Sequence, residues 1–190
     1  LSVVVLVFLT VEEPPDQPRH DVLAQKEASQ DLWRVLVPVA VFTLGNASEV
    51  FLLLKAGTTS TPALGLPLLW MALHVVKTAV SIPAGRLADR IGRQRMMGYG
   101  WVVYVVICTA FAFAKDSVVV AVLFVAYGTY SGMTEGAQKA LVAACAPKGK
   151  SGSAFGWFHF VQGLFGLFAS LFFGFLWQEF GDRVAFLCSA

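Results

Sequence analysis

Charged side chains are scarce in this 190-residue chain. Asp, Glu, Lys and Arg together make up 14% of it, whereas hydrophobic residues make up 57%. A soluble domain has roughly a quarter of its residues charged, so this composition excludes an ordinary soluble domain. Most of the chain is expected to face lipid or other membrane helices. The formal net charge is only +2, so we expect no nucleic-acid partner.

Signatures of several other protein classes are missing as well. The three cysteines, at 108, 145 and 188, form no CxxC pair and no metal-ligand spacing, so we expect reduced thiols, no disulfide and no metal. The apolar runs do not alternate with a period of two, which favours helices over β-barrel strands. No G-x-x-x-x-G-K-[ST] loop is present, which disfavours a built-in ATPase. We expect no cofactor.

Long apolar runs predict the membrane-spanning helices, since a helix crosses the bilayer core with about 20 apolar residues. Residues 1–11 predict the end of one span, and residues 12–31, with three prolines and mixed charge, predict a cytoplasmic linker. Residues 32–190 predict a transmembrane bundle. Because the chain opens and ends within apolar runs, we expect it to be part of a longer protein. The predicted spans of the bundle are about 32–54, 63–84, 97–114, 118–144 and 153–177, followed by the start of another.

Basic residues are divided unevenly between the two predicted sides of the membrane. Nine lie on the side of the linker and three on the other side, and the alternation from loop to loop is unbroken. Cytoplasmic loops carry an excess of Lys and Arg, so the richer side is predicted to be cytoplasmic. The first set is Arg19, Lys26, Arg34, Arg86, Arg90, Arg93, Arg95, Lys148 and Lys150, and the second is Lys55, Lys115 and Arg183.

A dense charge cluster, GRLADRIGRQR, occupies residues 85–95 between two predicted spans. Its spacing predicts a tight cytoplasmic turn, in which Gly85 and Gly92 permit close approach or unusual backbone angles. Asp89 is expected to pair with a neighbouring arginine or to approach the positive end of an adjacent helix. A simpler interpretation is that the cluster only fixes the topology of the loop.

The cluster resembles the signature loop of the major facilitator superfamily, G-x-L-a-D-r-x-G-r-[RK]. Gln94 departs from the basic residue of the pattern, and Arg95 supplies that charge one position later. The resemblance implies an all-α, polytopic transmembrane helix bundle, and a loop that latches one conformation of a transport cycle. The positions that would form this latch are Gly85, Asp89, Arg90, Gly92 and Arg93.

The order of the spans resembles the C-terminal half of such a transporter. A span and a cytoplasmic linker precede the two spans before the cluster, as for helix 6, the central loop, and helices 7 and 8. Residues 42–57 also resemble helix 7 of bacterial efflux-like members, and residues 135–163 resemble their helix 10 to helix 11 connection. The resemblance therefore implies a six-helix half that ends at the start of helix 12 and has an N-terminal half as its partner.

Polar residues recur in pairs inside four of the predicted spans. A charged side chain at a helix centre costs about 2.5–3.5 kcal/mol on insertion scales, so each needs a reason. The span at 97–114 has no charged residue, which matches the resemblance, since it implies that helices 7, 8, 10 and 11 flank a cavity while helix 9 is peripheral. We predict that the pairs line a solute or ion pathway, with His74 and Lys77 nearest the midplane. The pairs are Asn46 with Glu49, His74 with Lys77, Glu135 with Lys139, and His159 with Gln162.

Each pair also has a structural interpretation. Glu135 and Lys139 suit an ion pair, and Glu49 lies in the outer half of its span, where it can meet water. His159 and Gln162 suit a hydrogen bond between helices. Such roles would need no transported solute.

Three glycines in the span at 118–144 follow one another at a spacing of four: Gly128, Gly132 and Gly136. Small residues at this spacing let two helix backbones approach closely. We therefore predict close helix packing along this face rather than binding.

These observations favour a secondary active transporter, not an enzyme, that moves a small organic solute by alternating access. Titratable groups within the spans favour proton coupling, and the resemblance favours efflux. The alternatives are a transport-inactive receptor or scaffold on the same fold and a polytopic membrane enzyme with His74 or His159 as a base. The expected location is the bacterial inner membrane. The expected partners are the solute, protons, the lipid bilayer and the N-terminal half.

Overall fold

The structure is a computed structural model that describes residues 22–46, 48–58, 65–147 and 150–190, with side chains from residue 32 onward. All regular structure in these ranges is helical, which confirms the prediction of an all-α bundle. The predictions for 1–11 and for the first part of 12–31 lie outside the described residues. The helices are α2 (Val22–Gly45), α3 (Glu49–Thr58), α4 (Gly65–Ile91), α5 (Arg93–Phe113), α6 (Ser117–Cys145), α7 (Ser151–Phe180) and α8 (Asp182–Ser189).

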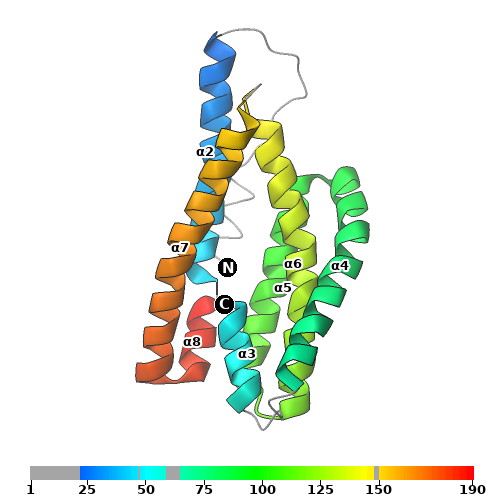
Figure 1. Ribbon diagram of the computed structural model, residues 1–190, viewed down its shortest axis with the longest axis vertical. Helices are drawn as coiled ribbons and strands as arrows, with labels where there is room; N and C mark the ends of the chain where they lie inside the picture. Colours follow the sequence, from blue (N-terminus) through cyan, green and yellow to red (C-terminus); the bar gives the residue numbers. More distant parts are fainter. Residues whose placement is uncertain (1–21, 47, 59–64, 148–149) are drawn as a thin grey trace.

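Five stretches of the described chain are long and apolar enough to cross a membrane. The first combines α2, from Leu32, with α3, and the other four are α4, α5, α6 and α7. Successive spans run in opposite directions, so that their ends gather at the two ends of the long molecule (Figure 1). Each of the five predicted spans is therefore present.

The helices form two packed groups. On one side α6 packs closely against α4 and α5, and on the other α7 packs against α2 (Figure 1). The short α8 contacts both α5 and α7 and joins the groups at one end, while α3 packs against α6. A cavity between the two groups is lined by residues of α2, α3, α6 and α7.

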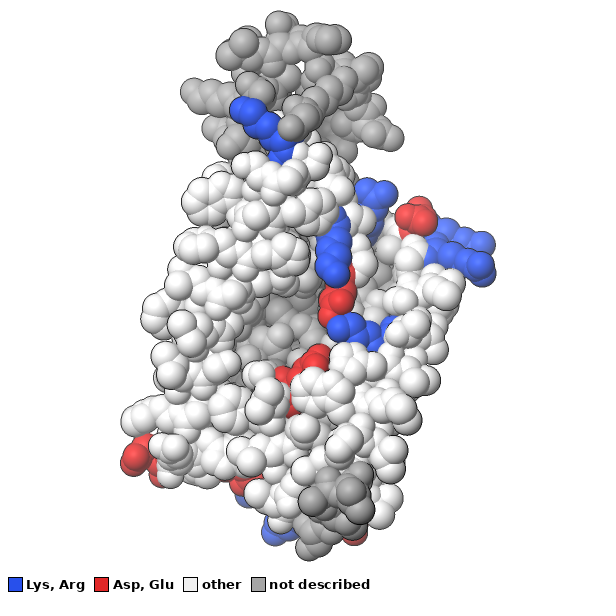
Figure 2. Space-filling view, in the orientation of Figure 1, with Lys and Arg blue, Asp and Glu red and all other residues white. Residues whose placement is uncertain are grey.

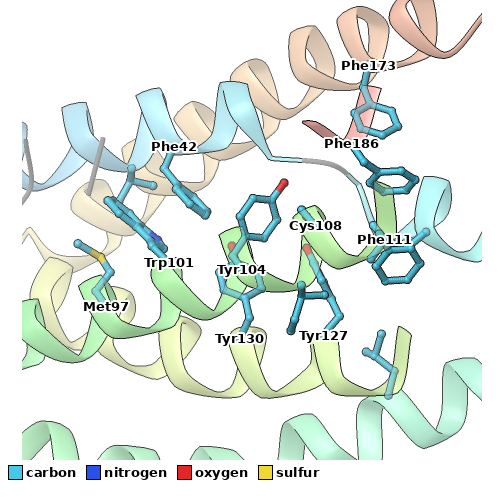
Figure 3. Close-up of a cluster of buried hydrophobic side chains, with 14 of the residues drawn as sticks. Phe42, Met97, Trp101, Tyr104, Cys108, Phe111, Tyr127, Tyr130, Phe173 and Phe186 are labelled. Atoms are coloured by element: carbon cyan, nitrogen blue, oxygen red, sulfur yellow. The ribbon is translucent and has the colours of Figure 1, made fainter. Parts of the chain in front are cut away.

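The largest buried side chains come from α5, the span without charged residues. Trp101, Tyr104 and Phe111 are almost completely buried, and Phe42 of α2 stacks on Trp101 with ring centroids 4.3 Å apart (Figure 3). Association of membrane helices depends on such packing rather than on exclusion of water. The resemblance implied that this helix does not flank the central cavity. None of the described residues that line the cavity comes from α5, although α5 is the most buried of the five spans.

Glycines of α6 bring it unusually close to α4. A Cβ atom at Gly128 would lie 2.5 Å from the carbonyl oxygen of Leu73, and one at Gly132 would lie 2.7 Å from that of Lys77. A Cβ at Gly136 would meet nothing within 4 Å. The predicted close packing is confirmed at Gly128 and Gly132 and is wrong at Gly136.

The first span is interrupted, contrary to the prediction of one continuous helix over 32–54. Helix α2 ends at Gly45 and α3 begins at Glu49. Backbone groups at this depth need partners inside the protein, and the Gly45 carbonyl accepts hydrogen bonds from the hydroxyls of Tyr104 and Ser189. The Phe51 amide donates to the Ser48 carbonyl at 2.9 Å. The break is thus stabilised by residues distant in the sequence.

Lys55 is not the loop residue that the charge distribution predicted. It lies within α3 and only 3% of its side chain is exposed. Its ammonium group lies 2.9 Å from Asp182 at the start of α8, donates to the Phe111 carbonyl, and faces the ring of Phe186. This buried charge therefore connects α3 to α5 and α8.

Substitution of the two glycines Gly132 and Gly136 by alanine should have opposite effects on stability. Gly132→Ala forces α4 and α6 apart and should cost about 1–3 kcal/mol, as overpacking does. Gly136→Ala has open space and should gain up to about 1 kcal/mol, because glycine is a poor helix residue. Thermal unfolding of the purified protein in detergent measures both changes. Equal midpoints for the two variants would contradict the close contact.

Loss of the Lys55 partner should also destabilise the protein. Partial burial raises the pKa of Asp182, but the hydrogen bond and charge of Lys55 outweigh it, so that the pKa lies below the ordinary 3.8. Asp182→Asn should therefore cost about 1–2 kcal/mol at neutral pH, reduced from the fully buried case because Asp182 is half exposed.

The destabilisation by Asp182→Asn should depend on pH, because the pKa of Asp182 is lowered in the folded protein. A carboxyl with a lowered pKa stabilises the fold above its unfolded pKa and loses that contribution as the pH falls through the folded value. The difference in unfolding midpoint between the parent protein and Asp182→Asn should thus be full above pH 3.8 and vanish below the folded pKa. Glu179→Gln, an exposed carboxylate near the same end, is the control and should show no comparable difference.

Candidate functional site

A cavity of about 400 Å³ lies between the two helix groups. Figure 2 shows acidic and basic side chains gathered in the middle of this face, between the α2 and α7 side and the α4 and α6 side. Most of the lining side chains are polar, although they belong to apolar spans. The lining residues are Phe42, Thr43, Asn46, Ser48, Glu49, Tyr127, Tyr130, Ser131, Thr134, Glu135, Gln138, Gln162, Gly163, Gly166 and Ser170.

Asn46, at the break between α2 and α3, is held by two tyrosines of α6. The Tyr127 hydroxyl donates to the Asn46 side-chain oxygen at 3.3 Å, and the Asn46 amide nitrogen donates to the Tyr130 hydroxyl at 3.2 Å. The two tyrosines lie one turn apart on the same face of α6 and are buried. These bonds fix the interrupted span against α6 and place an amide on the cavity wall.

Glu135 of α6 forms ion pairs with two lysines. Lys77 of α4 contacts one of its oxygens, and Lys139, one turn further along α6, lies 3.8 Å from the other. The close approach of α4 at Gly132 occurs at the carbonyl of Lys77, and so the glycine contact sets the position of the interhelical pair. The carboxylate of Glu135 therefore pairs with two lysines that lie outside the cavity lining.

Glu49, the first residue of α3, is the second carboxylate of the cavity wall. Its side chain is partly exposed, and among the residues that the structure describes no basic group lies within ion-pair distance of it. On the opposite wall the Gln162 amide of α7 donates to the Gln138 side-chain oxygen of α6 at 3.4 Å. This weak bond joins the two helix groups across the cavity.

The eight residues predicted to line a pathway fall into three groups. Asn46, Glu49, Glu135 and Gln162 line the cavity. Lys77 and Lys139 do not line it but contact Glu135. The two histidines lie outside it, and they are His74 and His159.

The position of each histidine follows from the rotation of its helix. Leu73 is buried in the contact of α4 with α6, and His74 is turned by about 100° from it, so its exposed ring contacts Trp70 instead, at 5.7 Å between centroids. His159 is exposed on α7, beside Phe158. The expectation that His74 borders the central cavity is wrong for this cavity.

Several cavity residues were missed because they are uncharged. Tyr127, Ser131, Thr134 and Gln138 recur at intervals of three or four along α6, the spacing of one helix face. That polar stripe was visible in the sequence. Tyrosine, serine and threonine are, however, also common at ordinary helix contacts in membranes.

The prediction of a loop over 85–95 is wrong. Helix α4 continues to Ile91, and only Gly92 separates it from α5. The extension occurs because Ala84 and Ala88 are buried with Met96 of α5 and Ala137 of α6. The charged residues of the signature therefore project from a helix end.

The two glycines of this segment differ in whether their backbone conformation requires glycine. Gly92 has φ of 97°, a conformation that other residues rarely adopt, whereas Gly85 is helical and has open space around it. Asp89 and Arg90 are exposed, and within the described part of the chain no ion pair involves Asp89. The pairing expected for Asp89 is absent there, and the latch role of Gly85, Asp89, Arg90, Gly92 and Arg93 stays a prediction.

The described residues that line the cavity form no metal-ligand constellation. Among the described residues, no three His, Cys, Asp or Glu side chains are grouped as metal ligands would be. The arrangement offers hydrogen-bonding groups, aromatic rings and carboxylates inside a membrane-spanning bundle. These are the components of a binding site for a small polar molecule.

Comparison with known proteins assigns the family. Residues 1–170 match the Major Facilitator Superfamily. The chain is also 30% identical over 187 residues to an uncharacterised MFS-type transporter of Methanocaldococcus jannaschii. That match covers 94% of the chain and 46% of the relative, so the chain spans about half the length of the curated relative it matches. No solved structure matches the chain significantly. The chain is therefore a multi-pass membrane protein that belongs to the Major Facilitator Superfamily.

Proposed function

We propose that the chain is part of a secondary active transporter that binds a small organic solute in the cavity between α2, α3, α6 and α7. The observation that carries this proposal is the concentration of polar side chains on the cavity wall, inside spans that are otherwise apolar. Polar and ionisable groups at membrane depth are costly, and they mark substrate or ion pathways. The transporter named among the chain's relatives supports the same role.

Alternating access is the mechanism that this arrangement favours. The cavity lies on one face of the bundle (Figure 2), where a second bundle would complete it. Transporters of this kind place the solute between two repeats that rock against each other, and discontinuous helices contribute to the site. The interruption between α2 and α3 lies on the cavity wall and supports this proposal. We assign the chain to the C-terminal half of the transporter.

Proton coupling and efflux are the further parts of the proposal. Two carboxylates, Glu49 and Glu135, line the cavity, and carboxylates within membrane-spanning segments mark ion pathways and proton relays. Glu135 holds Lys77 across the contact of α4 and α6. A change in the charge of Glu135 would therefore alter the contact between these two helices.

The full-length protein in lipid vesicles that enclose a pH-sensitive dye tests this proposal. Solutes from a panel of amines, sugars and amino acids are added under an imposed proton gradient, and solute uptake and internal pH are recorded. We expect saturable uptake of at least one solute together with proton movement. Glu135→Gln should slow uptake at least about tenfold, the effect of about 1.4 kcal/mol. The exposed carboxylate of Glu179 gives the control, Glu179→Gln, which should transport normally.

Three results would contradict parts of this proposal. Uptake that is unchanged when a protonophore collapses the gradient would reject proton coupling. Saturable binding without uptake would reject transport and favour a receptor. A solute that mass spectrometry shows to be chemically altered would favour an enzyme.

A further inference from the structure

We propose that the cavity binds the ammonium group of a small organic amine, with Glu49 as its counter-ion. This inference rests on the proposed function, because it takes the cavity to be the solute site. It adds the chemical class of the solute and the residue that selects it. Three features of the described residues carry it: the charge balance of the wall, the aromatic rings beside it, and its remaining polar groups.

Among the described residues, one carboxylate of the cavity wall has no basic partner. The cavity wall contains Glu49 and Glu135 and, among its described lining residues, no Lys, Arg or His. Glu135 pairs with both Lys77 and Lys139, whereas no described basic group lies within ion-pair distance of Glu49. Ionised side chains within membrane-spanning segments are usually paired with an opposite charge. A bound ammonium group would supply that charge.

Three aromatic rings on the same wall suit a cation. Phe42, Tyr127 and Tyr130 line the cavity with a small part of their surface, since these residues are only 8%, 2% and 6% exposed. The centroids of the two tyrosine rings are 5.1 Å apart, and that of Phe42 lies 5.9 Å from that of Tyr130 (Figure 3). An ammonium group within about 6 Å of a ring centroid is attracted to the ring face, and more strongly where water is excluded. Aromatic rings beside a carboxylate favour a cation over an anion.

The remaining groups of the wall can complete an amine site. The Tyr127 and Tyr130 hydroxyls already bond to Asn46, which keeps both rings in place. The hydroxyls of Ser48, Ser131 and Ser170 also line the cavity and can accept hydrogen bonds from an ammonium group. A carboxylate solute would meet the charge of Glu49, and a neutral solute would leave that charge unbalanced. The cavity therefore selects by charge.

Three probes of nearly equal size separate charge from shape: phenethylamine, 2-phenylethanol and 3-phenylpropionate. Binding of each to the purified full-length protein is measured by calorimetry at neutral pH. We expect the amine to bind at least about tenfold more tightly than the alcohol, and the acid to bind most weakly. Glu49→Gln should remove the advantage of the amine and leave the affinity for the alcohol within about twofold.

Two controls separate loss of the carboxylate from damage to the fold. Glu179→Gln removes an exposed carboxylate of α7 outside the cavity and should keep the preference for the amine. Glu49→Asp keeps the charge and should retain part of the preference. The unfolding midpoint of each variant shows that the bundle is intact.

The proposal is overturned if the amine does not bind, if the three probes bind equally, or if the acid binds best. The acid would bind best if a basic group of the other half paired with Glu49. The proposal is also overturned if Glu49→Gln keeps the preference for the amine. The vesicle assay separates these failures from failure of the transport proposal. Amine binding that depends on Glu49, without uptake of any solute, would reject transport and support the amine site. Uptake of another solute without a preference for the amine would support transport and reject the amine site.

Discussion

The structure depends on one constraint: polar groups within the membrane-spanning part must find partners inside the protein or face a water-filled cavity. The break between Gly45 and Glu49 illustrates it, because the exposed Gly45 carbonyl accepts bonds from Tyr104 and Ser189. At the same break Asn46 bonds to two tyrosines of α6. An interruption that would be costly in lipid is thereby turned toward the cavity. The hydrogen bonds that stabilise the break also hold Asn46 on the cavity wall.

The apolar part of the bundle holds that wall in position. Helix α5 fills the interior with Trp101, Tyr104 and Phe111, and the glycine contact brings α4 close enough for Lys77 to reach Glu135. The buried Lys55 anchors α3, the segment after the break, to α5 and α8. The functional side chains are thus placed by tightly packed helices rather than by loops. Such placement favours a preorganised site.

Much of the fold was predictable from the sequence, and about half of the predicted pathway residues line the cavity. Span lengths and the spacing of Gly128 and Gly132 predicted the helices and their closest contact, because both depend on local patterns. The end of α2 at Gly45 was missed because its stabilising partners, Tyr104 and Ser189, are distant in the sequence. His74 was misplaced because spacing predicts which residues share a helix face, but not which way that face points. Gly85 and Gly92 led to the prediction of a turn over 85–95. Burial of Ala88 instead extends α4 to Ile91.

The central claim is that water enters the bundle between α6 and α7, and the accessibility of introduced cysteines tests it most directly. Ser170 lines the cavity, whereas Phe168, on nearly the opposite face of α7, is 54% exposed on the outer surface. In the full-length protein with its native cysteines replaced, each position is changed to cysteine and treated from both sides of the membrane with a water-soluble, charged thiol reagent. The account predicts rapid reaction at Ser170→Cys and little at Phe168→Cys. Equal reaction at both positions, or faster reaction at Phe168→Cys, would contradict it.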